Sequence, residues 1–135
     1  MAGSTYGALA LEHYRHPHNV GSLDATDDEV GSALVGSPAL GEVIKLQFRV
    51  QAGTIVAARF KAFGSVSTIA IGSWLTQRLQ GCLLEDTQAI HSHDIVSALA
   101  LPAVKMHSAL LAEDALRAAV ANYTEKHLQP HHISE

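Results

Sequence analysis

The sequence predicts an α+β fold in which a three-stranded antiparallel sheet is covered by helices. Between residues 30 and 63 apolar and polar residues alternate with a period of two, which is typical of half-buried strands. After Gly64 the apolar residues recur at helical steps instead. Strands gathered in one block and helices in the next favour α+β over an alternating α/β arrangement.

The N-terminal part predicts one short helix and a long loop. In residues 5–14, Leu9, Leu11 and Tyr14 follow helical spacing. Pro17 disfavours helical geometry in the residue before it, so the helix should end there. Residues 19–32 are rich in Gly, Ser, Asn and Asp and should form a loop.

Three strands are expected at 30–37, 42–50 and 54–63, with a hairpin turn at "QAG", 51–53. In the second strand one face should be buried and the other polar, namely Ile44, Leu46, Phe48 and Val50 against Lys45, Gln47 and Arg49. The third strand should likewise bury Val56, Ala58, Phe60 and Ala62 and expose Arg59 and Lys61. Together they predict an antiparallel meander.

Four helical segments follow. The first carries Val66, Ala70, Trp74 and Leu79 at helix-like steps until Gly81 ends it. Residues 84–90 and 93–99 predict two short helices, the second with a cap signal from Ser92 or His93 and Asp94. A last helix from about Val104 to Lys126 should bury Ala109, Ala112, Leu116, Ala119, Val120 and Tyr123 and turn Glu113, Asp114 and Arg117 outward. The tail, 127–135, is polar.

Length and composition predict a single domain over residues 1–135 and narrow the function. With 47% apolar and 16% charged residues the chain can bury a core. No apolar run reaches the roughly 18–20 residues that a membrane span needs. The start carries no signal-peptide pattern, and Cys82, the one cysteine, cannot form an internal disulfide. We therefore expect a cytoplasmic protein that does not act at a membrane.

The charged residues and the histidines point to no dedicated binding site. The net charge is −4 and no basic stripe occurs, which argues against a nucleic-acid binder. Most of the nine histidines stand in polar stretches, so we expect them at the surface. No Walker, Rossmann or nucleophile-elbow pattern is present. An enzyme is not expected.

Four stretches carry a resemblance to a known family: "HYRHPHNVGSLD" (13–24), "VGSALVGSPALGEVIKLQFRV" (30–50), "ARFKAFG" (58–64) and "LPAVKMHSALLAEDALRAAV" (101–120). In order and without large gaps, they resemble the U-type iron–sulfur cluster scaffolds, IscU and the N-terminal domain of NifU. The resemblance implies the same α+β fold and a link to iron–sulfur cluster assembly or sulfur metabolism. It also implies cysteine desulfurase or chaperone-type proteins as partners. The chaperone-recognition segment of the family, "LPPVK", reads "LPAVK" at 101–105.

The resemblance also shows what is missing. The family holds its metal with three cysteines, and the matching positions here are Leu40, Ser65 and Ser108. Thiolates suit iron because sulfur is a soft donor that ionises near neutrality, whereas a serine hydroxyl is a hard donor and leucine has none. We therefore expect no cluster to be held, with an apolar plug at Leu40. Cys82 should lie away from these positions.

Two weaker sites stay open as alternatives. The family's turn aspartate is Glu42 here and its histidine is kept as His107, so these two could bind zinc or iron weakly. The helix start at 64–68, with Lys105 and Ser108, could instead hold an anion. The alternative to the metal site is that Glu42 is an ordinary turn residue and His107 an ordinary residue of the first helical turn. The alternative to the anion site is that the serines simply cap helices.

Overall fold

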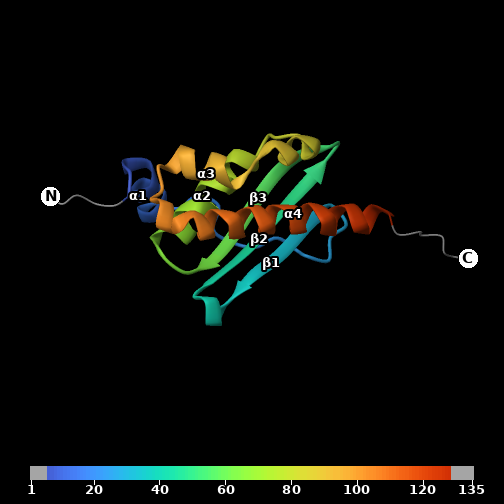
Figure 1. Cartoon of the computed structure of the whole chain (residues 1–135). Coiled ribbons are helices and arrows are strands. Elements are labelled where there is room, and N and C mark those ends of the chain that lie inside the picture. The colour runs from blue at the N-terminus through green and yellow to red at the C-terminus, as the bar shows by residue number, and fades with distance from the viewer. Residues whose placement is uncertain (1–5, 129–135) are drawn as a thin grey trace, which may run out of the picture.

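The computed structural model describes residues 6–128 and shows a three-stranded antiparallel sheet with helices packed on one face (Figure 1). The strand order is β1-β2-β3, so the chain runs as a simple meander. The predicted fold class is confirmed. The strands are β1 Val30–Ser37, β2 Glu42–Gln51 and β3 Thr54–Phe63, within a residue of the expected bounds.

One strand residue was placed on the wrong face. Val56 was expected to be buried, but it is exposed and its neighbour Ile55 is buried. The pairing of β2 and β3 shifts between Arg49 and Val50, as in a β-bulge. A bulge adds one residue to one strand and breaks the alternation of faces. Strict alternation through residues 54–63 was therefore an invalid assumption.

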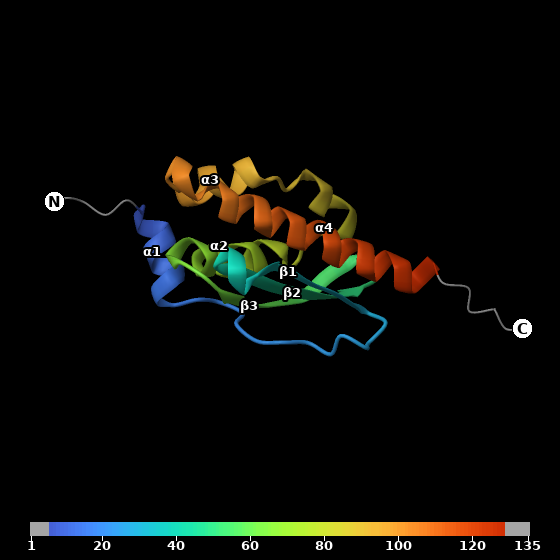
Figure 2. The same cartoon turned by 60° about the horizontal axis from the view of Figure 1, so that its bottom comes forward.

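The face of the sheet that points away from the helices is half covered by the loop of residues 16–29. Figure 2 shows this loop on the opposite side of the sheet from α4. Gln47 was expected to be exposed there and is buried instead. Its side-chain oxygen accepts from the Leu23 amide at 2.7 Å and its nitrogen donates to the Ser32 hydroxyl at 3.1 Å. The long loop folds over Gln47, which the period of the strand could not reveal.

The helices are α1 Ala8–Arg15, α2 Val66–Leu79, α3 Ser92–Leu99 and α4 Met106–Leu128. The segment expected as a helix at 84–90 is a 3-10 helix, Leu84–Ala89. The last helix was expected from Val104, but Ala103–Lys105 forms a 3-10 turn before α4. The cap residue of α3 is His91, whose amide is held by Asp94.

The first helix starts later than expected and buries a different face. It was expected over residues 5–14 from the helical spacing of Leu9, Leu11 and Tyr14, yet Leu9 and Tyr14 are exposed and the buried residues are Ala10 and His13. His13 contacts α2, where its Nδ1 lies 2.7 Å from the Ser73 hydroxyl. The spacing of apolar residues gives no sign of this polar contact between α1 and α2.

Helices α2 and α4 cover the inner face of the sheet (Figure 1). Helix α2 packs tightly on β3: a Cβ at Gly72 would lie 2.3 Å from the ring of Phe60. Two residues of α4 expected to face outward have structural contacts instead. Arg117 donates to the carbonyls of Thr87 and Ile90, and Glu113 accepts from the Ser92 amide.

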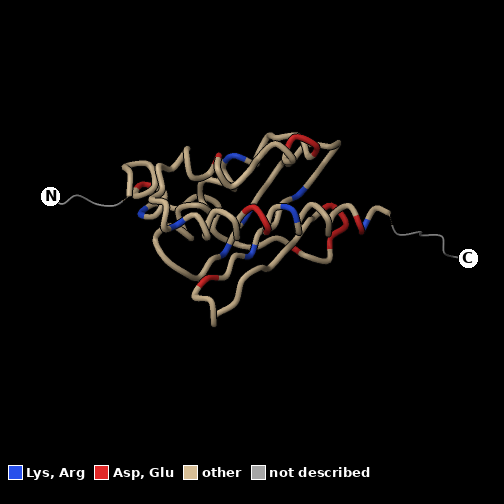
Figure 3. Tube along the Cα trace, viewed as in Figure 1, with Lys and Arg blue, Asp and Glu red and all other residues tan. Residues whose placement is uncertain are grey.

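Charge and polarity across the described residues agree with the expectations from composition. Basic residues are dispersed over the trace (Figure 3). None of the described helices is long and apolar enough to cross a membrane. Of the described histidines only His13 is buried, and His131 and His132 lie outside the described residues.

Candidate functional site

Three segments distant in sequence meet at one end of the sheet. They are the turn between β1 and β2, the step from β3 into α2, and the start of α4. Ser37 pairs with Glu42 and Val43 with Phe63, so the first turn and the end of β3 are adjacent. The turn holds a short 3-10 helix, Pro38–Leu40, closed by Gly41 at φ 80°. Glycine adopts that left-handed conformation without strain.

Glu42 and His107 form the central contact of this site. The carboxylate oxygen Oε2 of Glu42 lies 2.6 Å from Nε2 of His107. Glu42 is buried, whereas the His107 side chain is 63% exposed. The structure thus brings together the two residues named as metal ligands from the sequence.

Each nitrogen of the His107 ring faces an oxygen. Besides Glu42, the Val104 carbonyl lies 3.1 Å from Nδ1. Both oxygens are acceptors, and only the imidazolium donates from both nitrogens. Because metal ligation needs a free ring lone pair, a metal would have to replace one of these two contacts.

Thr68 connects the start of α2 to the carboxylate of Glu42. Its hydroxyl donates to Oε1 of Glu42 at 3.0 Å and accepts from the Ser65 amide at 3.0 Å. Thr68 is fully buried. The helix start at 64–68 was considered only as an anion site or a helix cap, so this role of Thr68 was not predicted. Its position three residues after Ser65, the capping-box spacing, was the available signal.

Leu40 is not the apolar plug that was expected. It is 76% exposed at the end of the 3-10 turn Pro38–Leu40. With Glu42, His107 and Leu111 it lines a cavity of about 240 Å³. Leu111 was missed by the sequence analysis. The cavity is open to solvent and has an apolar rim around one carboxylate and one imidazole.

Ser108 lies in the first turn of α4 and is fully buried. Its hydroxyl is the one buried side-chain polar atom without a hydrogen-bond partner among the described residues. A buried hydroxyl without a partner costs about 1–3 kcal/mol relative to a satisfied one. No other residue within 6–128 pairs with the oxygen at this position.

The hydroxyl groups at the helix start 64–68 are already engaged, and the unpaired Ser108 hydroxyl is buried in α4. Thr68 donates to a carboxylate, and Ser67 donates to the Tyr6 hydroxyl at 3.3 Å. The buried carboxylate of Glu42 places negative charge beside the start of α2, where an anion would have to bind. Like charges repel strongly where water is excluded, so this geometry disfavours the anion site.

Cys82 lies at the opposite end of the sheet from this site. It follows α2, and its carbonyl accepts from the Ile55 amide at 2.8 Å, next to the β2–β3 hairpin. Glu42 and Phe63 mark the other ends of the same two strands. The half-buried thiol of Cys82 therefore cannot reach the Glu42–His107 pair.

The donor set is small for a metal centre. Within residues 6–128 no group of three or more His, Cys, Asp and Glu side chains is placed to hold a metal ion. Tetrahedral structural zinc takes four good ligands, and Glu42 and His107 supply two. A metal ion here would need water for its remaining positions.

Comparison with known proteins identifies the family of this chain. The model of the NifU-like N terminal domain matches residues 5–130. The iron-sulfur cluster assembly scaffold protein IscU of Escherichia coli (strain K12) is 48% identical over 122 residues, covering 90% of this chain and 95% of that protein. Iron-sulfur cluster assembly protein 1 of Arabidopsis thaliana is 47% identical over 127 residues, covering 93% of this chain and 76% of that protein.

A solved structure agrees with the fold. The N-terminal part of a nitrogen-fixing NifU-like protein from Brucella abortus superposes with a TM-score of 0.68 at 16% identity, covering 89% of this chain and 94% of that one. At such low identity the likeness concerns the fold alone. The family match and the identity to the scaffold proteins establish more: the chain belongs to the NifU-like N-terminal domain family.

Proposed function

We propose that this protein serves iron–sulfur cluster assembly by binding protein partners and does not itself hold a cluster. One relative that matches most of the chain is named an iron-sulfur cluster assembly scaffold protein, another is named an iron-sulfur cluster assembly protein, and the chain belongs to the same domain family. A fold can keep its docking surfaces while its site changes, because the two depend on different residues. The protein is then a non-catalytic cytoplasmic component.

The observation that carries this proposal is the set of side chains at the three positions assigned to the cluster cysteines. Leu40 is exposed and has no donor atom, Ser65 caps α2, and Ser108 is buried in α4. A [2Fe–2S] cluster needs thiolate ligands, so these residues do not fit it. The same absence of thiols excludes a persulfide at these positions.

A network of side chains holds the site together in place of metal. The buried hydrogen bond from Thr68 to the Glu42 side chain joins α2 to β2, and a typical hydrogen bond contributes about 1 kcal/mol. The contact between Glu42 and His107 joins β2 to α4. Because His107 is largely exposed, that contact contributes only about 0–1 kcal/mol.

Cysteine desulfurase and chaperone-type proteins are the partners we propose. Residues 101–105 match the family's chaperone-recognition segment, and the structure leaves part of this segment open. Val104 is 73% exposed on the 3-10 turn before α4, and Lys105 is half-buried beside it. An exposed apolar residue next to a cation suits recognition by another protein.

Weak zinc or iron binding by Glu42 and His107 remains a second candidate function. Their contact distance of 2.6 Å supports this candidate, because two side chains so close together could approach the same ion. The ion would compete with the present hydrogen bonds of His107. We expect low affinity for that reason.

Partner binding is tested with a purified cysteine desulfurase from the same organism and, separately, a purified chaperone of the Hsp70 class. Calorimetry with the wild type and with Val104→Glu measures both interactions. We expect at least one partner to bind, and the chaperone interaction to weaken about tenfold in the variant, as for a central interface residue. No binding by either partner would refute the proposal.

A further inference from the structure

Helices α2 and α3 border a hollow that is separate from the candidate site. It has a volume of about 270 Å³ and is lined by Trp74, Arg78, Ala89, Ile90 and Asp94. We call it the α2–α3 hollow, and it shares no lining residue with the cavity of the candidate site. Trp74 and Arg78 lie one turn apart on α2, so both side chains project from the same face of that helix. The other wall is the connection from the 3-10 helix Leu84–Ala89 into α3.

Helix α4 holds the second wall of the α2–α3 hollow in place. Arg117 donates to the carbonyls of Thr87 and Ile90. Glu113, one turn earlier on α4, accepts from the Ser92 amide at 2.8 Å. These contacts fix the backbone on both sides of the turn into α3. A wall that is already ordered lowers the entropy cost of binding a ligand.

Arg78 and Asp94 bring opposite charges to the α2–α3 hollow and are not paired with each other. Arg78 has no ion pair or side-chain hydrogen bond within residues 6–128. Asp94 has two contacts: Oδ2 accepts from the His91 amide at 2.9 Å, and Oδ1 lies 3.5 Å from Nε2 of the largely exposed His93. A carboxylate offers about four acceptor positions, so Asp94 can accept from a further donor. The hollow thus presents one unused cation and one partly used anion.

Trp74 gives the hollow a large flat surface with one polar atom. Its side chain is half-buried, and its indole N–H has no acceptor within the described part of the chain. The Ser108 hydroxyl is the one buried side-chain polar atom without a partner there, so the indole N–H must reach solvent. An indole face packs well against apolar and aromatic groups. Trp74 is therefore suited to cover the apolar part of a ligand.

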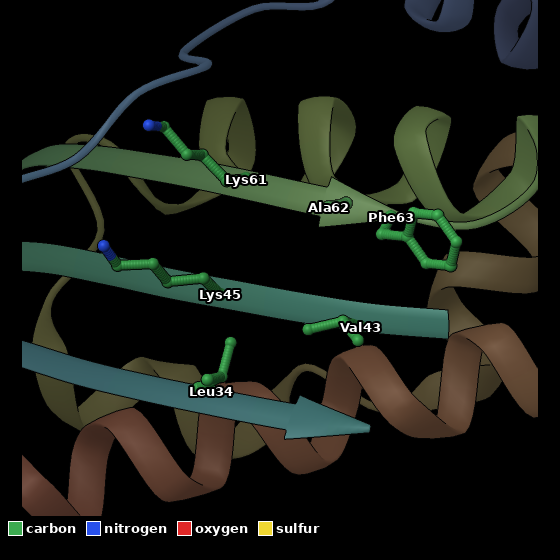
Figure 4. A pocket seen from close by; sticks show the side chains of 6 residues that line it. All are labelled: Leu34, Val43, Lys45, Lys61, Ala62 and Phe63. Atoms are coloured by element: carbon green, nitrogen blue, oxygen red, sulfur yellow. The ribbon is translucent and has the colours of Figure 1, made fainter. Parts of the chain in front are cut away.

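A hollow of the same volume on the outer face of the sheet has a different chemistry. Figure 4 shows the residues that line it, which are Leu34, Val43, Lys45, Lys61, Ala62 and Phe63. These residues include two lysines and no carboxylate, so this hollow cannot match both charges of a zwitterion. The α2–α3 hollow carries one charge of each sign, and the two hollows can be compared in one experiment.

We propose that the α2–α3 hollow binds a free α-amino acid with an aromatic or aliphatic side chain. The guanidinium of Arg78 pairs with the α-carboxylate, because its fork of N–H donors matches a carboxylate. The α-ammonium pairs with Asp94, and the apolar side chain of the ligand covers Trp74. This inference goes beyond the proposed partner-binding function and does not depend on it.

The size and the charges of the hollow both favour a small zwitterion. A volume of about 270 Å³ lies just below the range of roughly 300–1,000 Å³ that drug-sized ligands occupy, which suits a molecule as small as an amino acid. A ligand with negative charge alone, such as inorganic phosphate, is repelled by Asp94. A ligand with positive charge alone is repelled by Arg78. A zwitterion meets an opposite charge at each end.

The fluorescence of Trp74 reports binding directly, because Trp74 is the one tryptophan of the chain. L-phenylalanine and L-leucine are titrated into the full chain at constant ionic strength. Phenylpropionate and phenethylamine serve as analogues of L-phenylalanine that lack the ammonium and the carboxylate, respectively. We expect a saturable change in emission with both amino acids, at a Kd of about 1 mM or tighter, and at least about tenfold weaker binding of each analogue.

Matched variants separate the hollow from overall charge. Arg78→Gln and Asp94→Asn should each weaken L-phenylalanine about tenfold. The asparagine keeps an oxygen that accepts from the His91 amide, so the start of α3 stays capped. Arg15→Gln and Asp114→Asn make the same changes at exposed helix residues outside the hollow and should leave the affinity within about twofold.

A second control tests the hollow on the outer face of the sheet. Lys45→Gln/Lys61→Gln should also leave the affinity within about twofold, because its lysines do not contact the ligand. Thermal unfolding of every variant checks that it folds. Arg78 is exposed and unpaired, so Arg78→Gln remains decisive if Asp94→Asn does not fold.

Several results would overturn the inference. One is the lack of a saturable change with either amino acid up to about 20 mM, far above the expected Kd. Another is equal affinity for L-phenylalanine and its two analogues. Unchanged affinity in Arg78→Gln, or equal weakening in Arg15→Gln, would do the same. None of these readouts involves a protein partner or a cluster, so failure here leaves the proposed function intact.

Discussion

Replacing Ser108 by alanine should stabilise the protein, against the usual effect of a substitution in a buried site. The Ser108 hydroxyl is fully buried and has no partner among the described residues. Its removal relieves a desolvation penalty of about 1–3 kcal/mol and leaves only a small void. We expect a net gain of about 1 kcal/mol in the free energy of unfolding, or about 3–5 °C in Tm for a chain of this length.

Ser73 provides a matched control. It is also a fully buried serine within a helix, but its hydroxyl accepts from the His18 amide at 2.8 Å and lies 2.7 Å from Nδ1 of His13. Ser73→Ala should cost about 1–2 kcal/mol because two buried polar groups lose their partner. Alanine is a better helix former than serine in a helix interior, so at Ser73, in the middle of α2, this gain works against the expected loss.

Urea unfolding followed by circular dichroism measures both variants. A difference of about 2 kcal/mol between them corresponds to about 1 M in the midpoint, for an m-value near 2 kcal/mol/M. The midpoints of Ser108→Ala and Ser73→Ala should lie on opposite sides of the wild-type value. If Ser108→Ala destabilises the protein as much as Ser73→Ala does, the Ser108 hydroxyl has a partner and the reasoning is refuted.

Three further outcomes are expected. Burial, and secondly the nearby His18, lower the pKa of His13 in the folded protein below its usual 6.5. The unfolded chain therefore binds this proton more readily. The free energy of unfolding should be unaffected by His13 above pH 6.5 and should fall as the pH drops from 6.5 through the pKa of His13 in the folded protein. Urea midpoints at several pH values would measure this fall, which should be smaller in His13→Gln than in the wild type. An equal fall in the variant and the wild type would reject the prediction. Gly72→Ala should destabilise by about 1–3 kcal/mol because its Cβ meets the Phe60 ring, a prediction that an unchanged midpoint would contradict. Zinc calorimetry should show weak binding that His107→Ala abolishes; equal binding would place the metal elsewhere.

The sequence predicted the sheet well because its signals are local. The alternation in 42–50, the "QAG" hairpin and the glycine-bounded helix at 66–79 each follow from neighbouring residues. The errors lie where distant segments decide. The loop over Gln47 and the bulge that exposes Val56 depend on packing and pairing, which the period of a single strand does not contain.

At the candidate site the resemblance predicted which residues meet, but not how they are connected. Glu42 and His107 are in contact, as their alignment to the family's site suggested. The role of Thr68 and the exposure of Leu40 were not foreseen. Both follow from the direction in which a side chain leaves its turn, which is fixed only when the three segments pack together.

The central claim is that this member of the family holds no cluster, and anaerobic reconstitution with iron and sulfide tests it directly. Visible absorption is recorded for the wild type, for Cys82→Ser, and for Leu40→Cys/Ser65→Cys/Ser108→Cys as the control that restores thiols. We expect stoichiometric charge-transfer bands only in the triple variant. Stoichiometric bands in the wild type that persist in Cys82→Ser would contradict the account.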